Sequence, residues 1–129
     1  MLELVNFTQY WVGGTVGGPV NASTWNTSFH GYGEVMGERY QLCARAIDTQ
    51  PHRQGWLRFE ACTYGAHGVD GIAFIPGNSE RCAKASGLDW DQLRDCATGP
   101  LTTSRGLQMY RDSVFYSSEH CHSKTLQFA

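Results

Sequence analysis

The chain has 129 residues, a length typical of a single domain, so we predict that residues 1–129 fold as one domain. Hydrophobic residues make up 41% and aromatic residues 12%, which is too much for a disordered tail. No apolar run approaches the roughly 18–20 residues of a membrane span. The formal net charge of -2, without a Lys/Arg cluster, argues against a nucleic-acid binder.

The first half of the chain is predicted to contain one strand and two helices. Residues 2–12 are rich in β-branched and aromatic types with partial alternation, which indicates a strand. The polar stretch after it is a loop or a short second strand around residues 23–25. Apolar residues at helical spacing predict a helix over 34–48, which Pro51 ends, and a second helix over 56–62.

The second half opens with a Gly-rich segment, residues 65–77, which we predict to be an exposed loop. Asn78 is a good N-cap for a helix that carries Cys82 and stops at Gly87. Apolar residues at three-residue steps then predict another helix within residues 88–99.

The last predicted helix bears apolar residues at helical spacing over 107–115, and Thr102, Thr103 or Ser104 can cap it. The tail over 122–128 alternates and is predicted to be a strand. A strand at each end with helices between them packs most readily as helices on one or both faces of a small sheet. We therefore predict an α/β fold.

The five cysteines and the glycosylation sequons predict a secreted, disulfide-bonded glycoprotein. No two cysteines are spaced as Cys-x-x-Cys, so the sequence offers neither a zinc knuckle nor a local redox dithiol. Three sequons, at Asn6, Asn21 and Asn26, favour an oxidising, secretory context. We expect about two disulfides. The preferred pair is Cys82–Cys96, because both lie on consecutive short helices, and the other pairings stay open.

A motif in residues 28–43 has the spacing of a known family signature. It resembles the C-Q-H-G-x-x-E-C-x-x-N-x-x-E-x-C pattern of the gamma-interferon-inducible lysosomal thiol reductase family. The matching residues are His30, Gly31, Glu34 and Cys43. The segments similar to fungal-type members, in consistent order, are 56–62, 75–82 and 87–99. This resemblance implies a small, thioredoxin-related αβα sandwich stapled by disulfides.

The departures from this signature remove the family's chemistry. Ser28 and Val35 stand where the family has cysteines, and the catalytic Cys-x-x-Cys at a helix start has no counterpart in this chain. Thiol–disulfide exchange requires an attacking thiolate and a nearby resolving thiol. Reductase activity is therefore the alternative prediction only, with an altered or partner-supplied cysteine site.

We predict instead a secreted, non-catalytic, lectin-like protein that binds glycans. In length and general character the chain is similar to small mushroom lectins of the αβα-sandwich type, which bind N-glycan epitopes. Aromatic rings stack on the C–H face of a pyranose, while Asp, Asn and His side chains bind its hydroxyls. The candidate ligand-binding residues are Trp11, Trp25, His30, Tyr32, His67, Asp70 and Asn78. Core packing is the alternative for each aromatic residue, and it is the prediction for Trp56 and Trp90.

No metal, cofactor or catalytic group is predicted. His120 and His122 would share one face of a strand, but Cys121 would face the other way and a metal site would need a third ligand from elsewhere in the chain. The paired carboxylates Asp89, Asp91 and Asp95 indicate a solvated helix face. We expect glycan or glycoprotein partners and a homodimer, since multivalency strengthens weak sugar sites. A structural or defence protein that binds another protein is a third hypothesis.

Overall fold

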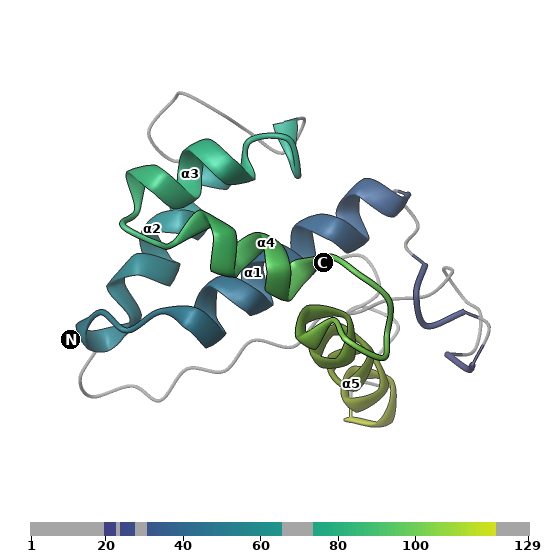
Figure 1. Ribbon diagram of the computed structural model, residues 1–129. Helices are drawn as coiled ribbons and strands as arrows, with labels where there is room; N and C mark the ends of the chain where they lie inside the picture. The colour runs from purple at the N-terminus through teal and green to yellow at the C-terminus, as the bar shows by residue number, and fades with distance from the viewer. Residues whose placement is uncertain (1–19, 23, 28–30, 66–73, 121–129) are drawn as a thin grey trace.

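The computed structural model describes residues 20–22, 24–27, 31–65 and 74–120. In Figure 1, α1 runs obliquely through the centre of the view, with α2 and α3 to its left and α5 to its lower right. Helix α1 packs against α2, α3, α4 and α5. The elements are α1 (Tyr32–Ile47), the 3-10 helix η2 (Pro51–Arg53), α2 (Gln54–Thr63), α3 (Ser79–Ala85), α4 (Trp90–Ala97) and α5 (Arg105–His120).

The predicted αβα sandwich is wrong for the part of the chain that the structure describes. Every regular element in these ranges is a helix, and residues 24–26 form a turn rather than a strand. The physical reason is that α1 buries residues on several sides, so the helices close the core by packing on one another instead of on a sheet. The strands predicted over 2–12 and 122–128 lie outside the described residues.

The helix predictions are confirmed, with small changes at the ends. The cap of α5 is Ser104, whose Oγ accepts a hydrogen bond from the Leu107 amide at 3.1 Å. Asp89 caps α4 in the same way, because its Oδ1 accepts from the Gln92 amide at 3.1 Å. Gly87, with a φ of 74°, ends α3 in the left-handed region that glycine adopts without strain.

Two clusters of buried side chains form the core. The larger one joins α1 to α2, α3 and α4, and the smaller one joins α1 to α5. Trp56 is 2% exposed, and Trp90 stacks on Tyr40 with ring centroids 5.7 Å apart, so both predicted core tryptophans are confirmed as packed. The larger cluster consists of Tyr40, Cys43, Ala44, Trp56, Phe59, Cys82, Ala83, Leu88, Leu93, Cys96 and Ala97.

Two disulfides connect these helices, as expected in number but not in pairing. Cys43 bonds to Cys96 and ties α1 to α4, with Cα atoms 5.9 Å apart. Cys62 bonds to Cys82 and ties α2 to α3, with Cα atoms 5.6 Å apart. The predicted Cys82–Cys96 pair is therefore wrong: although α3 and α4 are consecutive, Cys82 faces α2 and Cys96 faces α1.

Candidate functional site

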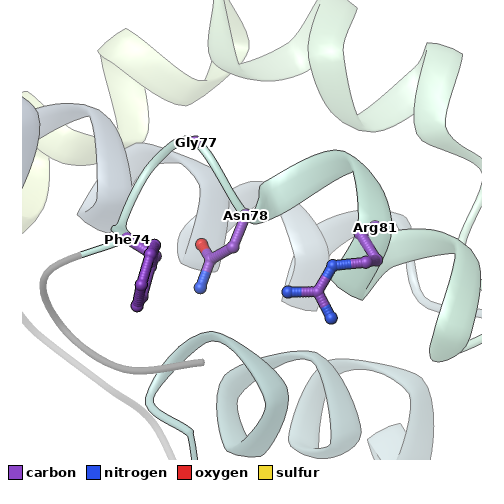
Figure 2. Close-up of a pocket in the computed structure, with 4 residues that line it drawn as sticks. All are labelled: Phe74, Gly77, Asn78 and Arg81. Atoms are coloured by element: carbon purple, nitrogen blue, oxygen red, sulfur yellow. The ribbon is translucent and has the colours of Figure 1, made fainter. Parts of the chain in front are cut away.

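A surface hollow of about 320 Å³ at the start of α3 is the candidate site, and Phe74, Gly77, Asn78 and Arg81 line it. A tight turn creates it: the Asn78 amide donates to the Phe74 carbonyl at 2.9 Å, and the Ser79 amide donates to the Pro76 carbonyl at 3.0 Å. Figure 2 shows the side chains of Phe74, Asn78 and Arg81 pointing to the same side, with Asn78 in the middle.

The side chains of the hollow differ in exposure and chemistry. Phe74 is 61% exposed, which is unusual for a large apolar side chain, and Arg81 is also exposed. Asn78 is only 5% exposed. The hollow therefore combines an aromatic ring, a guanidinium and an amide.

Only one of the two polar atoms of the Asn78 side-chain amide has a hydrogen-bond partner among the described residues. Its Nδ2 donates to the Thr63 carbonyl at 3.0 Å, which fixes the side chain against the end of α2. Its Oδ1 is buried and has no hydrogen-bond partner among the described residues. A buried carbonyl oxygen without a donor loses free energy, so the Asn78 side chain keeps an acceptor that the described residues leave unused.

The hollow is built on a fixed frame. The Cys62–Cys82 disulfide holds α3, which carries Asn78, against α2. On the other side, the Ile75–Pro76 segment packs against two glycines of α1: a Cβ atom added at Gly37 would collide with the Ile75 side chain, and one added at Gly33 would lie 3.7 Å from Pro76. The groups of the hollow are therefore positioned by α1, α2 and α3 together.

The structure places three of the seven predicted ligand-binding residues and brings only one of them to the hollow. Asn78 lines it. Trp25 is half-buried and packs on Tyr110 with ring centroids 6.3 Å apart, so it belongs to the smaller core cluster and not to the hollow. Tyr32 is 59% exposed at the start of α1. The other four predicted residues lie outside the described ranges: Trp11, His30, His67 and Asp70.

Sequence reasoning missed Phe74 and Arg81. The sequence did contain a signal for Phe74, which stands two residues before the Pro76-Gly77 turn and close to the helix cap Asn78. An aromatic residue in a turn has no helix face that would bury it, so its ring is a candidate for exposure. Arg81 lies three residues after Asn78, which places both on one side of α3.

No metal centre emerges among the described residues, where no three His, Cys, Asp or Glu side chains gather to hold an ion. His120 ends helix α5 instead of standing on a strand, and its ring stacks on Tyr116 with centroids 4.0 Å apart. Cys121 and His122 lie outside the described residues. None of the described helices is long and apolar enough to cross a membrane.

A buried carboxyl group lies apart from the hollow, on α1. Glu38 is 7% exposed, and its Oε2 has no hydrogen-bond partner in the part of the chain that the structure describes. Burial raises its pKa to about 8, and the nearby charge of Glu34 acts in the same direction. The Tyr110 hydroxyl opposes this shift from close by, without reaching normal hydrogen-bond geometry. Burial also raises the pKa of Tyr110.

Comparisons with known proteins give no relative of this chain. No protein-family model, no curated protein and no solved structure matches it. The resemblances to the thiol reductase family and to mushroom lectins therefore remain predictions from the sequence, and the site has to be interpreted from its own chemistry.

Proposed function

We propose that this protein is a non-catalytic glycan-binding protein and that the hollow at the start of α3 binds one sugar residue. The single observation that carries the proposal is the 61% exposed ring of Phe74, which lines the hollow together with the Asn78 amide and Arg81. An aromatic face and a planar amide side by side are the groups that a pyranose requires.

Each group of the hollow would have a distinct role in sugar binding. The Phe74 ring would stack on the C–H face of the pyranose, and the Asn78 Oδ1, after a small movement of the side chain, would accept a hydrogen bond from a sugar hydroxyl. Arg81 would donate to ring or hydroxyl oxygens. A volume of about 320 Å³ is at the lower end of small-molecule sites, which fits one sugar residue better than an extended oligosaccharide.

The cellular context of the proposal is secretion. Two intramolecular disulfides fit an oxidising compartment. We propose that the protein is secreted, and that a homodimer compensates for the weak binding expected of a single shallow site.

A glycan array followed by sugar titrations in solution tests the proposal. We expect saturable binding in the micromolar range, and Phe74→Ala should weaken it about tenfold through loss of ring stacking. Tyr116→Ala is the matched control, because Tyr116 is a 41% exposed aromatic residue on α5. A blank array, or equal affinities of the Phe74→Ala variant and the native protein, would contradict the proposal.

The redox alternative receives no specific support from the described residues. All four cysteines in these ranges are in disulfides, and Cys43, Cys82 and Cys96 are buried. Thiol–disulfide exchange through a free thiolate would therefore depend on Cys121, which lies outside the described part of the chain.

A further inference from the structure

The two disulfides differ in how far they are exposed. Cys43 is fully buried and Cys96 is buried beside it, and α5 covers this bond so closely that a Cβ added at Gly106 would lie 2.5 Å from Cys43 Sγ. Cys62, in contrast, is only half-buried in the last turn of α2, although its partner Cys82 is fully buried. A thiolate from solution can therefore reach the second bond through Cys62, whereas both cysteines of the first bond are covered.

The more exposed disulfide is also the main anchor of α3, which lies beside α2 (Figure 1). Helix α3 has only seven residues, and those that it buries are Ser79, Cys82 and Ala83. Cys82 has the largest apolar side chain of these three, and its sulfur is bonded to α2. An isolated helix of this length is not stable in water, so α3 depends on its attachment to the rest of the fold.

Loss of the bond would free the side of the hollow that α3 supplies. The two cysteines are 20 residues apart, and opening a crosslink over this distance favours detached states on the order of a hundredfold through chain entropy. Two side-chain hydrogen bonds then remain, from Asn78 Nδ2 to the Thr63 carbonyl at 3.0 Å and from Gln50 Nε2 to the Ser86 carbonyl at 2.9 Å. Asn78 and Arg81, which line the hollow, move with α3.

We propose that the Cys62–Cys82 disulfide is a redox switch: a dithiol reductant opens it, α3 separates from α2, and the hollow releases its ligand. The release of a sugar rests on the proposed function, whereas the opening of the bond and the separation of α3 do not. The Cys43–Cys96 disulfide stays closed and keeps α1 and α4 together, so the switch acts on one part of the fold.

The chemistry is a two-step exchange. One thiolate of the reductant attacks Cys62 Sγ, the Cys62–Cys82 bond breaks, and its electron pair goes to Cys82 Sγ, which takes up a proton. The second thiolate of the reductant then attacks the sulfur that is bound to Cys62, and Cys62 leaves and takes up a proton in turn. The reductant ends as a disulfide, so two electrons and two protons have passed from it to the cysteine pair.

Graded reduction of the disulfide-bonded protein with dithiothreitol tests the first step. Free thiols are trapped with N-ethylmaleimide at successive times and located by peptide mass spectrometry. We expect Cys62 and Cys82 to be labelled about tenfold faster than Cys43 and Cys96, because a thiolate has access to Cys62. Equal labelling rates, or earlier opening of the Cys43–Cys96 bond, would overturn the proposal.

Amide hydrogen exchange tests whether α3 separates when only this bond is open. We expect exchange in α3 to become on the order of a hundredfold faster, with α5 unchanged as the internal control. The double variant Cys62→Ser/Cys82→Ser should show the same pattern without reductant and without a bulky label. If this variant does not fold, the native protein held in dithiothreitol supplies the same measurement. Unchanged exchange in α3 after the bond has opened would refute the switch.

Sugar titrations of the oxidised and the selectively reduced protein test the release of the ligand. We expect binding about tenfold weaker or more after reduction, in keeping with the loosened α3, and full recovery after reoxidation with oxidised glutathione. Equal affinities of the two forms would refute the control of the hollow by this bond. If the oxidised protein binds no sugar at all, the proposed function fails, and the exchange of α3 alone decides whether the switch exists.

Discussion

Replacing Glu38 by glutamine is expected to make the protein more stable at pH 8 and to flatten its pH dependence. Glu38 is buried on α1, and burial raises its pKa to about 8 from the ordinary value of 4.5. The folded protein therefore keeps this carboxyl protonated at neutral pH, whereas the unfolded chain ionises it. Glutamine has the same shape and carries no proton that the unfolded chain would release, so the substitution removes this difference between the two states.

The pH window follows from the two pKa values. Below about pH 4.5 both states are protonated, and Glu38 does not disfavour folding. As the pH rises towards 8, only the unfolded state releases its proton, so the free energy of unfolding falls. The gap between 4.5 and about 8, at about 1.4 kcal/mol per pH unit, gives an upper limit of about 5 kcal/mol. Structural relaxation around the buried carboxyl group lowers this upper limit, and we expect the free energy of unfolding to fall by about 2–4 kcal/mol.

Urea unfolding followed by circular dichroism at several pH values between about 5 and 8 measures this effect. The native protein should lose stability across the window, and Glu38→Gln should lose much less. Glu119→Gln is the control, because Glu119 is an exposed carboxyl on α5. If Glu38→Gln has the same pH slope as the native protein, or is less stable than it at pH 8, Glu38 is not the buried, protonated acid that its surroundings indicate.

Three glycine substitutions, one of them a control, test the packing around the core and the hollow. Gly106→Ala should destabilise the protein by about 1–3 kcal/mol in urea unfolding, because an added Cβ would lie 2.5 Å from Cys43 Sγ. An unchanged unfolding midpoint would show that α5 can shift to make room for the methyl group. Gly37→Ala should weaken glycan affinity severalfold, because the new methyl group would displace Ile75 beside the hollow, whereas Gly33→Ala, with space for a Cβ, should bind normally. If these two variants bind the glycan equally well, the position of Ile75 in the turn does not affect binding at the hollow.

The helices were predictable from the sequence because their signals are local. Apolar residues at helical spacing, a proline after α1 and a glycine after α3 determine where each helix lies within a few residues, and Ser104 was among the candidate caps of α5. The disulfide pairing was not predictable, since it depends on which helices cross. Cys43 and Cys96 are 53 residues apart, and they meet because α1 packs across α4.

The candidate site was only partly predictable for a related reason. Asn78 was identified as a helix cap and as a polar ligand group, and the structure places it at the N-cap position of α3 and in the hollow. Its amide, however, bonds to the Thr63 carbonyl on another helix and not to its own helix. Whether Phe74 is exposed depends on how the turn at Ile75 and Pro76 packs against α1, which a one-dimensional pattern does not contain.

The two buried charged residues of α1 show how chemically different groups respond to the same environment. Glu38 and Arg39 are consecutive, so they point about 100° apart around the helix and do not neutralise each other. A buried carboxyl group resolves this by holding a proton, which accounts for the raised pKa of Glu38. A guanidinium does not release its proton in proteins, so Arg39 is instead held by neutral acceptors. The hydrogen bonds of Arg39 to the Gly99 carbonyl and to Ser104 Oγ therefore take the place of an acidic partner, whereas Glu38 makes the stability of the fold depend on pH.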